Sequence, residues 1–295
     1  MPFSSDEILV LPPRAVPLPV RCQQTFGGVL NQIAWWLLAI LTPFVWKFAL
    51  DCEVLAWPRF TGALGTAQGR ITRSIDTHST EGDPDEGGTP IYENQYTFSL
   101  NGTEYSGQSY ATGQSLPPGT TVRIDYRISN PNVSRAQDMR AYRFPAAAFL
   151  VLIFPCVAVA AIVFGMRKGR KARRLLARGV VTEGVLTPKD EPVRQVGKRI
   201  FYEYNYAFTG PDGKAHMTST LNVDTADDVP ESRMQILYDP RDPNLAMPVD
   251  DLPAAVRIDD QGCIQPVSHR RALLLMIAPL LTIGGNLLFA AFRFL

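Results

Sequence analysis

Three long apolar stretches interrupt an otherwise polar chain. They lie within residues 26–50, 144–166 and 269–295, and the middle stretch contains no charged residue. Because an α-helix rises about 1.5 Å per residue, each stretch is long enough to cover a hydrocarbon core of roughly 30 Å. The first is too long for the apolar region of a cleaved signal peptide, and no small-residue cleavage site follows it. The pattern therefore predicts three transmembrane helices.

The two segments between these stretches alternate polar and apolar side chains with a period of two, which is typical of strands with one buried face. Strands and turn signals follow the same order in both segments: 92–100, Asn101-Gly102 and 103–110 in the first, and 201–208, Pro211-Asp212-Gly213 and 214–221 in the second. Such short connections favour antiparallel pairing. We expect each segment to form a small antiparallel barrel or sandwich of about five strands, with the glycine-rich stretch 78–89 as a loop.

A phrase near the end of each segment is repeated. It reads VRIDYRISNPNV at 122–133 and MQILYDPRDPNL at 234–245, so the tyrosine and the Pro-Asn pair of the first copy recur 112 positions later. A repeat at fixed spacing indicates one structural unit used twice. We interpret the phrase as structural, with the tyrosine ring packed on a strand pair and the prolines in a turn; ligand binding is the alternative. Its members are Tyr126, Pro131, Asn132, Tyr238, Pro240, Pro243 and Asn244.

The predicted fold class is a mixed membrane protein, with three transmembrane α-helices and two small antiparallel β modules related by an internal repeat. The predicted division is a proline-rich tail (1–25), the first helix (26–50), the first module (51–143), the second helix (144–166), a basic flank with the second module (167–268) and the third helix (269–295). The tail is expected to be extended, because it cannot bury enough apolar surface to fold alone.

A dense basic run follows the middle stretch, comprising Arg167, Lys168, Arg170, Lys171, Arg173 and Arg174. Such a run marks the cytoplasmic end of a membrane helix. It predicts a cytoplasmic N-terminus and second module, with the first module and the C-terminus outside. Arg14, Arg21, Arg270 and Arg271 agree, whereas Arg135, Arg140 and Arg143 oppose this orientation and are outnumbered. The run could also bind anionic lipid.

The last apolar stretch contains Gly284, Gly285 and Asn286. Small residues let helix backbones approach each other, and an asparagine amide can hydrogen-bond between helices. We interpret these residues as a helix-packing site. A polar site in a conduction path is the alternative.

Charge and composition indicate no reactive chemistry. The chain has 29 basic and 28 acidic residues, so it carries no basic field for nucleic acid. Its four cysteines form no CxxC pair, and its three histidines share no metal-ligand spacing. We expect no catalytic, metal or cofactor site. Modification of Cys52, or of the acceptor patterns at Asn101 and Asn132, stays open.

The second module resembles the domain-of-unknown-function family 3592, whose members are small β modules flanked by membrane helices. The resemblance is carried by alternating aromatics in 204–208 and by ILYDPRDPNLA at 236–246; the first module departs from it, with Arg-Ile-Ser at 127–129 in place of the Asp-Pro pair. It implies the membrane-flanked fold but no catalytic residues or activity.

The leading functional hypothesis is a non-catalytic scaffold or envelope accessory protein in the cell membrane, which is the inner membrane in a bacterial cell. Exposed edges of its sheets would recruit other membrane or envelope proteins, and membrane lipid is the other expected partner. Self-association into a homo-oligomer stays open. The alternatives are an immunity-type protein that captures a toxin, an accessory subunit of a transporter or channel, and a membrane hydrolase.

Overall fold

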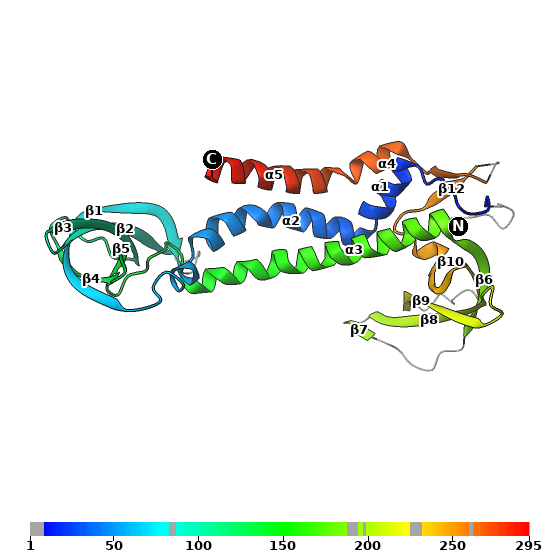
Figure 1. Ribbon diagram of the computed structural model, residues 1–295, viewed down its shortest axis with the longest axis horizontal. Coiled ribbons are helices and arrows are strands. Elements are labelled where there is room, and N and C mark those ends of the chain that lie inside the picture. The colour runs from blue at the N-terminus through cyan, green and yellow to red at the C-terminus, as the bar shows by residue number, and fades with distance from the viewer. Residues whose placement is uncertain are drawn as a thin grey trace. The chain divides into compact units, whose positions relative to one another are not determined.

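The fold combines long helices with antiparallel sheets (Figure 1). The computed structural model describes residues 9–82, 87–187, 194–196, 199–224, 232–259 and 262–294. The chain divides into two compact units. One is a central unit, Ile40–Cys156, and the other is a terminal unit formed by Met1–Ala39 and Val157–Leu295.

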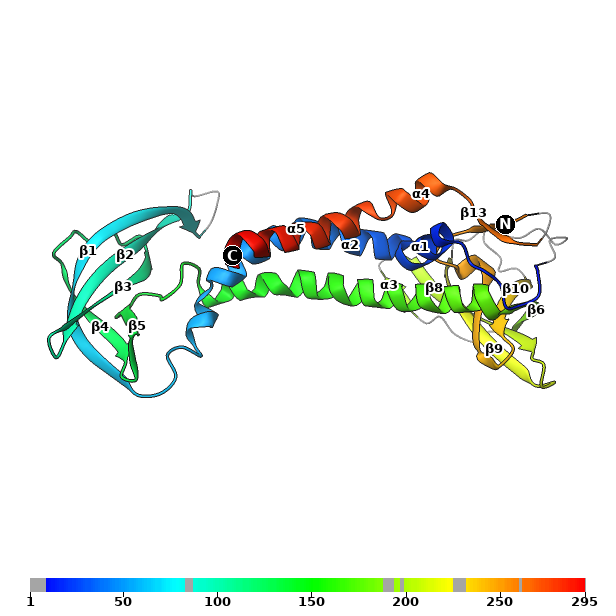
Figure 2. The ribbon, with the colours of Figure 1, turned by 45° about the horizontal axis from the view of Figure 1, so that its top comes forward.

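A five-stranded antiparallel sheet makes up most of the central unit (Figure 2). Its strands are β1 (Leu64–Glu81), β2 (Thr89–Leu100), β3 (Thr103–Thr112), β4 (Thr121–Arg127) and β5 (Asn130–Ala136), in the order β3-β2-β1-β4-β5. The two edge strands lie next to each other: the backbone N–H of Ala136 on β5 donates to the Ser109 hydroxyl on β3 at 2.8 Å. The sheet therefore closes almost into a barrel, which covers edges that would otherwise be open.

The interior of this sheet is filled by large side chains at alternating strand positions. The core contains Ile71, Tyr96, Phe98, Ile124 and Ala136. The predicted tyrosine contact is present, since the Tyr126 ring stacks on Phe98 with 5.8 Å between ring centroids. Gly65 on β1 pairs with Tyr126 on β4, and a Cβ at Gly65 would come within 2.6 Å of the tyrosine ring. The glycine thus makes room for the ring.

Two sequence predictions in this unit are wrong in detail. The stretch expected to be a loop from residue 78 begins inside β1, which continues to Glu81; the strand carries a register shift between Asp76 and Thr80. His78 lies in that irregularity with a φ of 54°. The Pro131-Asn132 pair was expected in a turn but lies at the start of β5. Because β5 is an edge strand, a proline there need not break a hydrogen-bonded ladder.

The terminal unit contains a second antiparallel sheet. Its strands are β6 (Val180–Thr187), β7 (Arg194–Val196), β8 (Arg199–Thr209), β9 (Ala215–Asp224), β10 (Arg233–Asp239) and β11 (Asp242–Pro248). They follow the order β11-β10-β6-β8-β7, with β9 also paired to β8. A separate hairpin joins β12 (Val256–Ile258) to β13 (Ile264–Pro266). Tyr206, Phe208, Ile236, Tyr238 and Ala246 form the core of the larger sheet.

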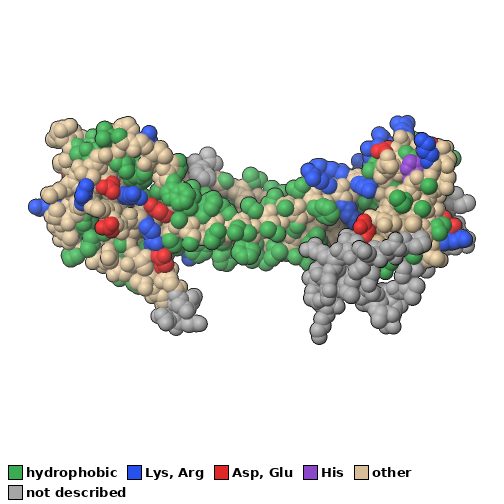
Figure 3. All heavy atoms as spheres, turned by 90° about the horizontal axis from the view of Figure 1, so that it is seen from below, with side chains coloured by type: hydrophobic (Ala, Val, Ile, Leu, Met, Phe, Trp, Pro, Cys, Tyr) green, Lys and Arg blue, Asp and Glu red, His purple; other side chains and the backbone are tan. Residues whose placement is uncertain are grey.

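The α-helices of the described residues are α1 (Leu18–Phe26), α2 (Val29–Phe48), α3 (Ile153–Arg178), α4 (His269–Leu274) and α5 (Ile277–Phe294). Short 3-10 turns adjoin them at η1 (Ala49–Asp51), η2 (Glu53–Ala56), η4 (Ala146–Leu152) and η5 (Val249–Asp251). Among the described residues, three helical segments are long and apolar enough to cross a membrane, namely Val29–Asp51, Ala146–Arg178 and His269–Arg293. The space-filling view shows mostly hydrophobic side chains on the face of the helical region that it presents (Figure 3).

The glycines that bring helices together are not the predicted ones. A Cβ on Gly284 or Gly285 would meet nothing within 4 Å, and the Asn286 amide donates to the Thr282 carbonyl of its own helix at 2.7 Å. The close approaches occur on α3. A Cβ on Gly165 would lie 2.7 Å from the Asn31 side chain, and one on Gly169 would lie 2.3 Å from the Gln24 carbonyl oxygen.

The N-terminal segment is not wholly extended as predicted, because residues 18–26 form α1. Val16 and Val20 enter a core with Leu175 of α3 and Leu237 of the sheet. The buried members are Val16, Val20, Ala172, Leu175, Leu176, Leu237, Met247, Val249, Leu252, Val256, Ile258 and Ile264. The prediction failed because the segment buries its few apolar residues against partners distant in the sequence.

Candidate functional site

Helix α3 continues through the basic run and separates its residues onto two flanks. The basic side chains of the helix point toward different neighbours, because successive residues of an α-helix are rotated by about 100°. One group lines a cavity together with the N-terminal segment and comprises Arg170, Arg173 and Arg174 of the run and Arg178 farther along α3. The other group faces the second sheet and comprises Arg167, Lys168 and Lys171. The run is therefore two sites rather than one patch.

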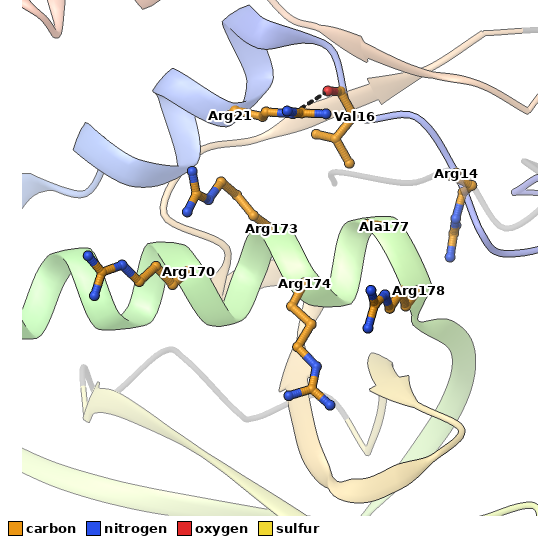
Figure 4. A pocket seen from close by; sticks show the side chains of 8 residues that line it. All are labelled: Arg14, Val16, Arg21, Arg170, Arg173, Arg174, Ala177 and Arg178. Atoms are coloured by element: carbon orange, nitrogen blue, oxygen red, sulfur yellow. Dashed lines mark hydrogen bonds between the residues drawn. The ribbon is translucent and has the colours of Figure 1, made fainter.

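The first group lines a pocket to which the N-terminal segment adds Arg14 and Arg21 (Figure 4). The open cavity measures about 470 Å³, and Val16 and Ala177 complete its lining. In the close view Arg21 lies on α1 and Arg173 extends from α3 toward α1, while Arg14 and Arg178 lie near the C-terminal end of α3 (Figure 4). We call this cavity the arginine pocket. The sequence analysis used Arg14 and Arg21 only for orientation, and no local motif connects them with α3.

Three of these arginines have partners in the structure. The Arg21 Nε donates to the Val16 carbonyl at 2.7 Å, and an Arg14 Nη2 donates to the Gly179 carbonyl. Arg174 forms an ion pair with Asp239, with 2.9 Å between Nη2 and Oδ2. Other donors are buried without a partner among the described residues, namely Nε and Nη1 of Arg14 and Nε of Arg173.

Burial lowers the pKa of the Arg14 guanidinium to about 10. The group still carries its charge at neutral pH, because that pKa lies well above 7. The cause is loss of solvent around the cation, which has no anionic partner among the described residues. Arg14 therefore holds a positive charge in a site where the structure supplies little to compensate it.

Asp239, which follows the tyrosine of the repeated phrase in the second sheet, is buried and makes two contacts. Its side chain is only 2% exposed and accepts hydrogen bonds from Arg174 through Oδ2 and from the Arg241 backbone N–H through Oδ1 at 3.1 Å. The second bond is the contact that an aspartate commonly makes with the backbone two residues ahead in a turn. The first joins the phrase to α3, which the sequence analysis missed.

The remaining members of the phrase are placed as follows. Tyr238 packs on Phe208 with 5.1 Å between ring centroids. Pro240 lies between β10 and β11, whereas Pro243 lies in β11, an edge strand like β5. Asn132 and Asn244 are exposed. The predicted tyrosine packing is confirmed, and the predicted turn position of Pro243-Asn244 is wrong for the same reason as that of Pro131-Asn132.

A second cavity of about 770 Å³ lies between α3 and the second sheet. Arg167, Lys168 and Lys171 line its helix side, and exposed Phe164 and Met217 add apolar surface. Basic side chains gather where the helices meet this sheet (Figure 3). This cavity contains both lysines of the run, whereas every basic residue of the arginine pocket is an arginine.

The arginines that opposed the predicted orientation all have acidic partners within the central unit. Arg135 pairs with Glu53 at 3.5 Å, Arg140 with Glu81 at 2.7 Å and Arg143 with Asp51 at 3.4 Å. These pairs fasten the start and end of the unit to its sheet. Their arginines thus have a structural role that is independent of membrane orientation.

The Glu81–Arg140 pair makes an acid-dependent prediction. Burial alone raises the pKa of Glu81, but hydrogen bonds from Thr112 and Arg140 and the Arg140 charge together lower it below 4.5. A carboxyl whose folded-state pKa is lowered stabilises the fold above its unfolded pKa, and this contribution is lost as pH falls through the folded-state pKa. We expect Arg140→Gln to flatten the loss of central-unit stability below about pH 4.5, measured by near-ultraviolet circular dichroism. Exposed Glu104→Gln is the matched control, and equal acid profiles for wild type and Arg140→Gln contradict the prediction.

The described residues contain no group of three or more metal-ligating side chains. His216 instead contacts Asp212 of its own hairpin at 3.1 Å. The structure instead gathers guanidinium groups of the N-terminal segment and of α3 around one cavity. Such an arrangement can hold an anion by charge and hydrogen bonding.

Comparisons with protein-family models, with curated proteins and with solved structures give no match. The resemblance of the second module to family 3592 therefore stays a prediction. The described part of the chain thus combines antiparallel sheets with three helices that are long and apolar enough to span a membrane.

Proposed function

We propose that this chain is a multi-pass membrane protein with its N-terminus and second sheet in the cytoplasm and its first sheet and C-terminus outside. Three membrane-length helices support the multi-pass arrangement. The orientation rests on the basic run at the end of α3, because such runs are retained on the cytoplasmic side.

We further propose that the two sheets are copies of one module. Strand order supports this, since β9-β8-β6-β10-β11 corresponds to β3-β2-β1-β4-β5. Register supports it as well: Gly69 pairs with Val122 and Gly184 with Met234, positions that the repeated phrase aligns. Register shifts follow Tyr126 and Tyr238 in both sheets.

We infer that the protein works by binding, as a membrane-fixed scaffold or envelope accessory, and that it performs no catalysis. The observation that carries this inference is the shared core of the terminal unit. The N-terminal segment, the end of α3, the second sheet and the β12–β13 hairpin bury side chains in one cluster. A module fixed in this way to a membrane helix is a rigid platform for a partner.

We propose exposed sheet faces, rather than open strand edges, as the route to a partner. Strand addition needs an open edge, and in the first sheet β3 and β5 close on each other. Partner binding is therefore better assigned to exposed faces, such as that of Val185 and Met217 on the second sheet. The hydrogen bond of Asn286 within α5 gives no support to a conduction path.

Crosslinking in intact membranes tests this function. A photo-crosslinker at Met217 should give a defined adduct with another protein or a second copy of the chain, and one at Lys47 serves as the control. Reporter fusions within each sheet, in the same cells, should give opposite accessibility. Recovery of only the uncrosslinked monomer from Met217 would contradict the scaffold role, and both sheets accessible from one side would contradict the topology.

A further inference from the structure

We propose that the arginine pocket binds a phosphate-bearing ligand. The pocket is lined by six arginines from two segments far apart in the sequence, Arg14 and Arg21 from the N-terminal segment and the four of α3. This inference does not depend on the scaffold role or on the membrane orientation.

Charge is the first argument. Arg174 alone among the six has a carboxylate partner within the described residues, namely Asp239. The other five cations share one cavity, and like charges at close range repel by on the order of 1 kcal/mol per pair even in water, and by more where solvent is partly excluded. An anion bound in the pocket would attract each of these cations and so offset their mutual repulsion.

Unused hydrogen-bond donors are the second argument. Nε and Nη1 of Arg14 and Nε of Arg173 are buried without acceptors among the described residues. A buried donor without a partner costs free energy, so such groups indicate an acceptor that belongs in the site. Two of these donors belong to Arg14 on the N-terminal segment and one belongs to Arg173 on α3 (Figure 4).

The choice of arginine is the third argument. Lysine and arginine serve equally to retain a helix end in the cytoplasm. The basic run contains both, yet neither of its lysines lines the arginine pocket. Arginine has a planar fork of donors that matches two oxygens of a phosphate, whereas lysine is a point charge. The selection of arginine on this flank therefore indicates recognition of an oxyanion rather than a need for charge alone.

Two sources can supply the phosphate. With a rise of about 1.5 Å per residue, Arg170 lies about 6 Å and Arg178 about 18 Å beyond Met166, the last residue of the apolar stretch. The first distance is within reach of a phospholipid headgroup, and the second lies in the aqueous phase. A phosphomonoester lipid and a soluble phosphate compound share the chemistry, and the test separates them.

The test uses the full-length protein, freed of lipid in neutral detergent. One arm titrates inorganic pyrophosphate by calorimetry. The other compares nanodiscs of phosphatidylcholine with nanodiscs that also contain phosphatidic acid, with retained phosphatidic acid measured by native mass spectrometry. The Arg170→Gln/Arg173→Gln variant should weaken binding at least about tenfold in whichever arm binds, because two charge-assisted contacts are lost. The control is Arg167→Gln/Lys168→Gln, which removes the same charge from the other flank and should change binding little.

A measurement on the wild-type chain guards against misfolding of the variant. Phenylglyoxal modification, read by peptide mass spectrometry, should be slowed by the bound probe at Arg170 and Arg173 but not at Arg167. Binding by pyrophosphate alone identifies a soluble ligand, and retention of phosphatidic acid alone identifies a lipid. Binding in neither arm, equal weakening in both variants, or equal protection of all three arginines overturns the proposal.

Discussion

Replacing Gly169 with alanine should destabilise the terminal unit by about 3 kcal/mol, the upper part of the range for overpacking a close contact. The added Cβ would lie 2.3 Å from the Gln24 carbonyl oxygen and 2.9 Å from the Thr25 Cα. Both are backbone atoms, so they cannot turn away as a flexible side chain can. Helix α1 would have to leave α3, which would open the core that contains Val20 and Leu176. Thermal unfolding in detergent, followed by tryptophan fluorescence, measures the loss.

Gly285→Ala is the matched control for this prediction. It makes the same chemical change in α5, where an added Cβ meets nothing within 4 Å. Its effect should be neutral or slightly stabilising, since alanine favours a helix over glycine by up to about 1 kcal/mol. If the two substitutions have equal effects, the α1–α3 contact does not exist as described. If Gly285→Ala alone is harmful, α5 packs against a second copy of the chain at that glycine.

Replacing Arg174 with glutamine should cost about 3 kcal/mol, the lower end of the range for removing one partner from a buried ion pair. The lower end applies because Asp239 is 2% exposed whereas the Arg174 side chain is 50% exposed, so solvent partly compensates. The substitution would leave the buried Asp239 carboxylate without its arginine partner. Chemical denaturation of the purified chain measures the change.

A second substitution distinguishes the buried charge from other effects of losing Arg174. Asp239→Asn in the Arg174→Gln background removes the uncompensated charge and can keep the turn hydrogen bond from the Arg241 N–H. We expect the double variant to recover much of the lost stability. Arg178→Gln, which removes a cation without a described carboxylate partner, should change stability far less. A double variant no better than Arg174→Gln would contradict the buried-charge explanation.

The same ion pair accounts for a difference between the two phrases. Tyr238 is followed by aspartate, which pairs with α3, whereas Tyr126 is followed by Arg127. The second sheet packs at the basic end of α3 and needs a carboxylate there. The aspartate of the phrase is therefore explained by its neighbour and not by the turn alone.

Much of the strand pattern was predictable, because it depends on neighbours close in sequence. The alternation in 92–100 and 201–208 predicted strands that the structure places at β2 and β8. Asn101-Gly102 predicted the β2–β3 turn, since both residues adopt positive φ values, 49° and 83°. The fifth strands were not placed, because Pro131 and Pro243 read as turn residues unless the strand is known to be an edge.

The helix contacts were predicted at the wrong glycines for a physical reason. Gly284-Gly285 lies in an apolar stretch, where small residues are expected to pack, but sequence cannot show which face meets a neighbour. Gly165 and Gly169 have the spacing of four that puts small residues on one helix face. This spacing is present in the sequence, but it overlaps the basic run, which was interpreted as the flank of a membrane helix and not as a packing site.

The sequence by itself determined the membrane-length helices, the strand alternation and the repeated phrase, because each follows from hydrophobicity or periodicity within a short window. Only the tertiary structure decided that Arg14 and Arg21 join the arginines of α3, that α1 folds onto Gly169, and that Asp239 is buried against Arg174. Those contacts connect residues far apart in the chain. Their free energy depends on burial and on the approach of opposite charges, which exist only once the chain has folded.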